Sequence, residues 1–553
     1  MRRFTDNRVL RALAAVQLVA ASMLVVADDA RSAEPHRVQH FQTSDRCIAC
    51  HNGMVTPSGE DISIGLDWRA SLMANSARDP YWQASVRREI TDHPAARVPI
   101  EDGCADCHMP MARTEANLRG QPGAVFAHLP FDPAKPEDAE ARDGVSCSLC
   151  HQITAEKLGT PQSFSGGFVI GPPDAAGVHS EFGPFDIDHG RTRIMQSSTG
   201  GFRPTHADHI RKSELCASCH TLITTAFGPE GKPIGTFPEQ VPYQEWLHSE
   251  YRDKQSCQSC HMPQIQEDAP IVRVLGVNRP GVARHEFVAA NFFMQRVLAR
   301  YHDELDVSAE ARELTVAADR TVQFLQTRAA RISVDAPQMR SGRLEASVSV
   351  ENLGGHKLPT AYPSRRAWLH FLVRDRNGGK VFESGALNPD GSIQGNDNDA
   401  DPARFEPHYT QIRSSDQVQI YESILKDSAG AVTTGLISTV GYLKDNRLLP
   451  HGFDKSTAEA DVAVHGEAAN DPAFGAHGHR IRYSVEVGSA PGPFQVEAEL
   501  WYQPIAYRWA NNLKRYDAAE PQRFNSYYDS MGGATAAVLA RSCAPAPCQT
   551  DGR

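Results

Sequence analysis

The chain has 553 residues, a formal charge of −11, 41% hydrophobic residues and 22% charged residues. This length predicts two to four domains, and the hydrophobic content excludes a disordered chain. The acidic excess argues against nucleic acid or an anionic membrane as a partner, and it would suit a partner with a basic docking patch.

The N-terminus predicts a secretory signal peptide over residues 1–33. Arginines 2, 3, 8 and 11 precede an apolar run from Ala12 to Ala27, which is the pattern of an export signal. An uncleaved anchor is the alternative, because the run is nearly long enough to span a bilayer. Gln17 and the many alanines weaken it as a span, so we expect cleavage, a periplasmic or secreted protein, and no stable membrane span afterwards.

Five copies of C-x-x-C-H dominate the first half of the chain. This spacing is typical of covalent c-type haem attachment, in which both thiols bind one porphyrin and the following histidine is the proximal iron ligand. The predicted attachment cysteines are Cys47, Cys50, Cys104, Cys107, Cys147, Cys150, Cys216, Cys219, Cys257 and Cys260, and the predicted proximal ligands are His51, His108, His151, His220 and His261.

Two other uses of paired cysteines compete with haem. Zinc sites use C-x-x-C pairs, and so do disulfide and redox pairs. Neither requires a histidine directly after the second cysteine, yet all five copies have one. We therefore expect five haem c groups in a helical, loop-rich domain over residues 34–300.

A six-coordinate haem iron needs a second axial ligand. His209, seven residues before Cys216, and His285, before a helix predicted from Asn291 to Arg300, rank first. Met73 could also be a ligand but fits core packing better. Lower-ranked candidates are His128, His179, His189, His206 and His93, of which His179 and His189 lie in a long loop predicted over residues 159–204.

In the second half, the spacing of apolar residues changes from a helical pattern to the alternation typical of strands. A linking helix is predicted over residues 301–330 with Ser308 as its N-cap. Alternating patterns follow at residues 343–351 and 494–502, with a hairpin over residues 367–383. We predict a β-sandwich-like domain over residues 331–505 and a C-terminal helical tail over residues 506–553 that folds back on the haem half. The predicted fold class is α+β.

Four features of the second half could carry chemistry. His356, in a Gly-Gly-His-Lys-Leu-Pro-Thr turn, is a candidate haem ligand supplied by this half, and His408 is a weaker one. Residues 396–401 are rich in oxygen ligands and could hold calcium, although the glycine and final glutamate of an EF-hand loop are missing. Cys543 and Cys548 could form a disulfide in an oxidising compartment.

These motifs resemble the multihaem cytochrome c superfamily that includes hydroxylamine oxidoreductase, octahaem tetrathionate reductase and pentahaem nitrite reductase. The resemblance rests on the five attachment sites, on His209 upstream of Cys216, and on Met-Pro after the second and fifth sites, and it covers residues 40–300. It implies closely packed haems that pass electrons along a chain. The second half, with Gly355–Thr360 and Lys444–Arg447, resembles the C-terminal region of secreted multihaem cytochromes.

Three functions remain open at this point. The first is an electron-transfer protein serving redox partner proteins, other multihaem cytochromes among them. The second is a reductase or oxidase of a small nitrogen or sulfur compound at one five-coordinate haem. Pentahaem nitrite reductases typically carry C-x-x-C-K at their catalytic haem, and this sequence has none, which lowers the enzyme hypothesis. The third is a conduit that polymerises through its β-domain.

Overall fold

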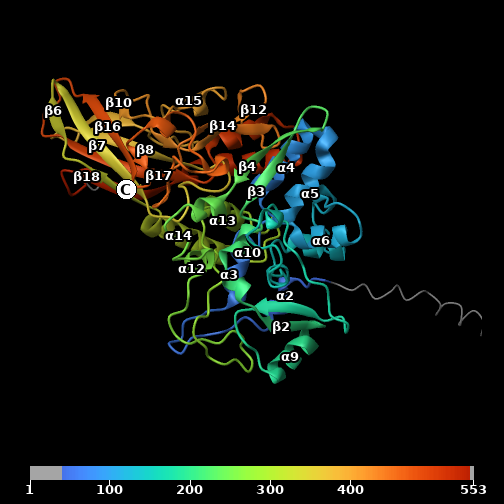
Figure 1. Cartoon of the computed structure of the whole chain (residues 1–553). Helices are drawn as coiled ribbons and strands as arrows, with labels where there is room; N and C mark the ends of the chain where they lie inside the picture. The colour runs from blue at the N-terminus through green and yellow to red at the C-terminus, as the bar shows by residue number, and fades with distance from the viewer. Residues whose placement is uncertain (1–39, 549–553) are drawn as a thin grey trace, which may run out of the picture. The chain divides into compact units, whose positions relative to one another are not determined.

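Short helices joined by long loops make up the first part of residues 40–548, the range that this computed structural model describes (Figure 1). The predicted signal peptide lies outside that range. The helices of this part are α2 (Ser44–Ile48), α3 (Ile64–Arg69), α4 (Pro80–Asp92), α5 (Arg97–His108), α6 (Pro110–Leu118), α7 (Pro136–Arg142), α8 (Cys147–Cys150), α9 (His189–Thr199), α10 (Ser213–Ala217), α11 (Pro242–Leu247), α12 (Cys257–His261) and α13 (Phe292–Arg300).

Helix starts in this part follow ordinary capping rules. Asp79 caps α4, because its carboxylate accepts from the backbone N–H groups of Tyr81 and Trp82, and Pro80 occupies the first turn. Asn291 caps α13 in the same way. The helix predicted at Asn291–Arg300 is therefore confirmed. No helix among the described residues is long and apolar enough to cross a membrane.

The segment predicted as a long loop, residues 159–204, contains regular structure. Strand β1 (His179–Gly183) pairs in parallel with β2 (Phe202–His206), and α9 connects them. A second pair, β3 (Leu222–Phe227) and β4 (Pro233–Gln240), forms an antiparallel hairpin. Each pair contains only two strands, so neither produced a clear alternating pattern in the sequence.

Helix α14 (Ala311–Arg328) is the predicted linking helix, but its cap differs from the prediction. Glu310 is the N-cap residue, and its side chain forms a capping box with Glu313. Ser308 lies two residues too early. The side chains of Glu310 and Glu313 each accept from the other residue's backbone N–H, and this pair of bonds is preferred to a cap by the Ser308 hydroxyl alone.

Among the described residues, the second half contains two large sheets and one smaller sheet. The first has the order β10 (Gln411–Ile412), β16 (Gly478–Glu486), β7 (Arg343–Asn352), β5 (Ala330–Val334), with β6 (Gln338–Arg340) and β15 (Phe474–Gly475) at its edges. The second has the order β11 (Ile420–Tyr421), β8 (Arg366–Arg374), β17 (Gln495–Gln503), β18 (Ala537–Ala544), with β9 (Lys380–Ser384) paired to β8. A smaller sheet combines β12 (Ser423–Asp427), β13 (Val432–Thr433) and β14 (Thr439–Asp445).

The two larger sheets pack face to face. Phe371 of β8 stacks on Tyr483 of β16 with ring centres 3.7 Å apart. Along β7 every second residue is buried, as the alternation predicted. The hairpin predicted at residues 367–383 is confirmed by the pairing of β8 with β9, and the predicted α+β class is confirmed. Residues from Phe41 onward belong to one compact unit, so the domain boundaries at 300, 330 and 505 stay predictions.

The C-terminal tail is only partly helical. Helices α16 (Tyr507–Asn512) and α17 (Ala519–Ser530) match the prediction, but β18 then adds an edge strand to the second sheet. The predicted helical tail over residues 506–553 is therefore wrong for β18, because pairing with β17, a tertiary contact, overrides the alanine-rich local sequence. The tail does fold back: Arg87 of α4 binds Glu520 of α17 at 2.9 Å.

Candidate haem centres

All five C-x-x-C-H motifs are built as single helical turns. The second, third and fifth motifs lie at the end of α5, in α8 and in α12. The first and fourth begin in the last two residues of α2 and α10 and continue as a turn, in which the histidine N–H donates to the carbonyl of the first cysteine. Cysteines three residues apart lie on the same side of a helical turn, so both sulfurs of a pair can reach one edge of a porphyrin. None of these ten cysteines forms a disulfide.

Four of the five motif histidines are held by a backbone carbonyl at Nδ1. The distances to Nδ1 are 2.6 Å for His51 (from Ile271), 2.9 Å for His108 (from Ser76), 2.6 Å for His151 (from Phe182) and 2.5 Å for His261 (from Val288). The first of these contacts spans 220 residues of sequence.

This hydrogen bond determines which ring nitrogen is free. A carbonyl can only accept, so Nδ1 carries the proton and the lone pair lies on Nε2. Metal-bound histidines show this arrangement, because the bond fixes both the tautomer and the ring orientation. Burial also lowers the pKa of each of these histidines, to about 4 for His108, which keeps the imidazoles neutral. The motif residues therefore fit an axially ligated haem iron.

Two motif histidines face a second histidine. The ring centres of His151 and His285 lie 6.5 Å apart with planes 23° from parallel. Those of His261 and His356 lie 6.3 Å apart with planes 15° from parallel. An iron with an imidazole nitrogen about 2 Å away on each side places the two ring centres about 6 Å apart. Both pairs have this spacing.

A buried ion network holds the segment that carries His356. Lys357, which is 0% exposed, donates from Nζ to Asp445 at 2.7 Å and from its backbone N–H to Glu245 at 3.0 Å. Arg447 joins the same two carboxylates, at 2.8 Å and 3.0 Å. Glu245 belongs to α11, between the fourth and fifth motifs. The network thus ties the β half to the haem half beside His356.

The other three motif histidines have different surroundings. The indole of Trp82 stacks on the His108 ring at 4.3 Å with planes 4° from parallel. His51 is held by Ile271 as described, and no other described histidine ring is stacked on it. Burial, with smaller contributions from the nearby His261 and Arg365, lowers the pKa of His220 to about 4.

Thiols of different motifs lie close together and shift one another's pKa. Cys147 lowers the pKa of Cys47, Cys107 lowers that of Cys219, and Cys216 lowers that of Cys257 to about 7. Cys150, whose pKa burial raises to about 12, is also influenced by Cys219. The first motif therefore neighbours the third, the third neighbours the fourth, and the fourth neighbours the second and the fifth.

The remaining candidate ligands have other partners. Nε2 of His209 lies 2.8 Å from the carbonyl of Ile153, close to the third motif. Nδ1 of His128 lies 2.7 Å from Asp138. His179 is buried in β1 with its ring edge-on to Phe202. Within residues 40–548, neither His209 nor His128 is stacked on a motif histidine, and the role of all three as ligands stays a prediction.

The lower-ranked candidates also lie elsewhere. His93 binds Ser438 through Nε2 at 2.9 Å, and His189 and His206 are exposed. The backbone carbonyl of Met73 accepts from Val145, two residues before the third motif.

The zinc alternative can be tested on the described cysteines. A structural zinc site needs four converging ligands. Within residues 40–548, the group of three ligand-type side chains with converging atoms is His408, Asp471 and His479, and it contains no cysteine. The motif cysteines of the described residues thus form no converging group of this kind, which gives the zinc alternative no support.

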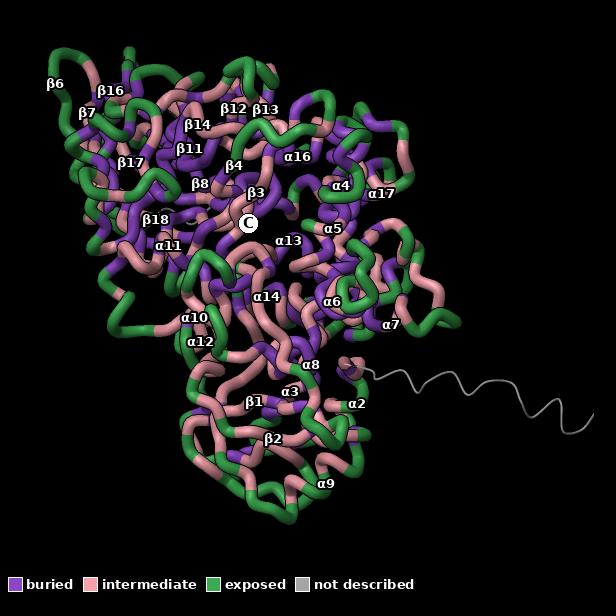
Figure 2. The backbone as a smooth tube through the Cα atoms, turned by 45° about the vertical axis from the view of Figure 1, so that its right-hand side comes forward, coloured by how far each residue is buried: buried purple, intermediate pink, exposed green. Residues whose placement is uncertain are grey.

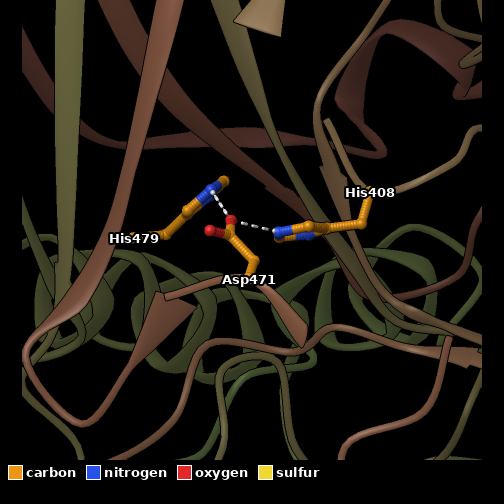
Figure 3. A group of neighbouring side chains, drawn as sticks. All are labelled: His408, Asp471 and His479. Carbon is orange, nitrogen blue, oxygen red and sulfur yellow. Dashed lines mark hydrogen bonds and ion pairs between the residues drawn. The ribbon is translucent and has the colours of Figure 1, made fainter. Parts of the chain in front are cut away.

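The His408 cluster is itself a hydrogen-bonded group (Figure 3). Asp471 lies between the rings, with one oxygen 3.0 Å from Nε2 of His408 and 3.3 Å from Nε2 of His479. Asn446 and Gln419 donate their amide N–H groups to Nδ1 of His408. Nε2 of His408 must then carry a proton and donate to Asp471, so this nitrogen is not available to a metal.

The acidic segment over residues 396–401 also has protein partners. Asp399 makes a bidentate bond to buried Arg366, at 2.8 and 3.0 Å, and Asp397 binds Arg404. These bonds give the predicted calcium site no support, and it stays a prediction. The predicted disulfide between Cys543 and Cys548 is present.

Several residues of the site escaped the sequence reasoning. The carbonyls that bind Nδ1 leave no trace in side-chain patterns, because any residue can supply a carbonyl. Glu245 and Trp82 stand in helices without a motif. Lys357, Asp445 and Arg447 do lie in the segments that resemble other secreted multihaem cytochromes, but that resemblance did not predict that they form a buried ion network.

No family model matches the chain, and no curated protein matches it. Among solved structures, the chain is similar to a penta-heme cytochrome c552 from Thermochromatium tepidum, with 16% sequence identity over 92% of this chain and 99% of that chain, and a TM-score of 0.49. A likeness at this level carries no argument about function, which therefore rests on the residues described above.

Proposed function

We propose that this chain is an exported pentahaem c-type cytochrome that transfers electrons through five covalently bound haems. The attachment cysteines and proximal histidines are those of the five motifs. The observation that carries the proposal is the set of four Nδ1–carbonyl bonds, which leave Nε2 of each of these histidines free for iron. When bound, the haem irons supply reversible one-electron chemistry.

The protein's own residues supply the second ligand at two of the centres. His285 faces His151 and His356 faces His261 at the spacing that a shared iron requires. Two histidines bound to one iron would leave no position for a substrate, which favours electron transfer over catalysis at these centres. The connected series of attachment turns favours it as well, since transfer requires neighbouring centres.

The electron paramagnetic resonance spectrum of the oxidised, haem-quantified protein tests this proposal. We expect five haems per chain and at least two low-spin irons. His356→Ala and His285→Ala should each convert one iron to high spin, whereas His477→Ala, at an exposed histidine of the β half that is no ligand candidate, should convert none. A protein without covalent haem would refute the proposal. A high-spin signal near one iron per wild-type chain would favour the oxidoreductase alternative.

A further inference from the structure

The loop over residues 270–281 holds the first haem motif and is itself exposed. Its Ile271 carbonyl binds His51 Nδ1 at 2.6 Å, and its Arg273 backbone N–H donates to the Cys50 carbonyl at 3.1 Å. The Arg273 side chain lies against Gly53, two residues after His51, where an added Cβ would come within 3.2 Å of it. This loop therefore lies directly over the first attachment turn.

The same loop concentrates exposed apolar side chains. Of the ten exposed large hydrophobic residues in the described chain, three belong to it and a fourth, Ile194, belongs to α9. Val274 is 68% exposed and Leu275 is 61% exposed. Arg191 of α9 donates to the Leu275 carbonyl at 2.7 Å, so loop and helix lie side by side. Ile194 lies one turn further along the same helix face.

Leu275 also has an unfavourable backbone conformation. Its φ is +58°, in the left-handed region where a leucine is disfavoured. The protein thus keeps a bulky apolar side chain exposed, at a position where glycine would be more stable. Such outliers persist where the exposed group has a use.

The charge of this surface is opposite to that of the whole chain. The loop and α9 together contain Arg191, Arg193, Arg273 and Arg279 and no acidic residue, although the chain carries −11. Asp188, the N-cap residue directly before α9, pairs with Arg191, so the other three arginines give this surface its positive charge. Arg193 and Arg273 form no ion pair with any described residue. In Figure 1, α9 and the loops beside it lie at the end of residues 41–548 remote from the two large sheets, and Figure 2 shows that most residues there are intermediate or exposed.

We infer that this surface, made of Ile194, Val274, Leu275 and Val277 with an arginine rim, docks an acidic one-electron transfer protein. An apolar centre with a charged rim is the composition of small transient interfaces, and rim charges steer the encounter. The location directly over the first motif lets such a partner exchange electrons there. The inference rests on the proposed electron-transfer function and adds the partner's chemical class and its docking site. It reverses the expectation from net charge, which favoured a basic partner.

Stopped-flow reduction of the oxidised full-length holoprotein tests the inference. The electron donor is a reduced, acidic plant-type [2Fe–2S] ferredoxin at low ionic strength. Arg193→Glu with Arg273→Glu should lower the second-order rate constant about tenfold or more, and the difference from wild type should disappear at high salt. Arg340→Glu with Arg376→Glu makes the same charge change on exposed residues of the β half and should leave the rate within twofold.

Leu275→Gly separates docking from folding. It should slow reduction by ferredoxin while the unfolding midpoint stays equal or rises, because the strain is relieved. Dithionite should reduce all these variants at the wild-type rate, and the haem midpoint potentials should not move.

Three results would overturn the inference. Equal rate losses in the surface variant and the β-half variant would mean that only net charge matters. Shifted haem potentials would mean that the arginines pair with haem propionates. Wild-type binding to anionic vesicles, with ferredoxin rates unaffected by the variants, would assign the surface to a membrane. If the protein instead carries no haem, even dithionite produces no haem spectrum, and the proposed function itself fails.

Discussion

The buried network beside His356 yields the sharpest prediction. Asp445 is 1% exposed and shares its carboxylate between Lys357 Nζ at 2.7 Å and Arg447 at 2.8 Å. Asp445→Asn keeps the shape but leaves two buried cations with Glu245 as their only buried carboxylate partner in the network. Removing one partner of a buried ion pair costs about 3–5 kcal/mol. We therefore expect Asp445→Asn to lower the free energy of unfolding by about that amount.

The same substitution should also change one haem centre. Lys357 follows His356 directly, so loosening its ammonium and backbone bonds frees the ring that faces His261. We expect part of one iron per chain to become high spin in native buffer. Guanidinium unfolding followed by tryptophan fluorescence measures the stability, and the paramagnetic resonance spectrum measures the spin state.

Asp399→Asn is the matched control. It breaks the buried pair with Arg366, whose bonds of 2.8 and 3.0 Å are comparable, but no haem-ligand candidate adjoins it. It should cost a similar free energy and leave every iron low spin that is low spin in the wild type. A loss below about 1 kcal/mol in Asp445→Asn, or the same spin change in both variants, would refute the reasoning.

Three further predictions follow from the described contacts. Burial would raise the pKa of Asp445, but the charges of Arg447 and Lys357 outweigh it and hold that pKa below its usual value. The stability that this carboxylate contributes is therefore complete above about pH 4 and is lost on further acidification. An acid titration of the unfolding free energy should lack this loss in Asp445→Asn. Cys543→Ser opens a loop with a sequence separation of 5 and should cost about 2 kcal/mol in thermal unfolding, with no change in the haem spectrum. Trp82→Leu removes the ring stacked on His108 and should shift the potential of one haem in a spectroelectrochemical titration, whereas Trp82→Phe should restore most of it.

The local patterns predicted much of this fold because they act over a few residues. The alternation at residues 343–351 predicts β7 since each second side chain must enter the sheet core. Strand β18 was not predicted, because its pairing with β17 is a tertiary contact that its own sequence does not reveal.

The haem site, too, was predictable only where the pattern is local in sequence. The attachment cysteines and proximal histidines follow from spacing alone, because the chemistry occurs within five residues. The facing of His261 by His356 depends on contacts such as that of Glu245 with Lys357, 112 residues away. Spacing could therefore rank His285 and His356 as candidates but could not assign either to a particular motif.

The number of covalently bound haems tests the central claim most directly. Intact mass spectrometry of the mature protein, denatured and acidified so that only covalent groups remain, measures it. The account predicts a mass excess of five haems, each lost only when both cysteines of its motif are changed to serine. A polypeptide mass without haem, or with bound zinc under native conditions, would contradict it.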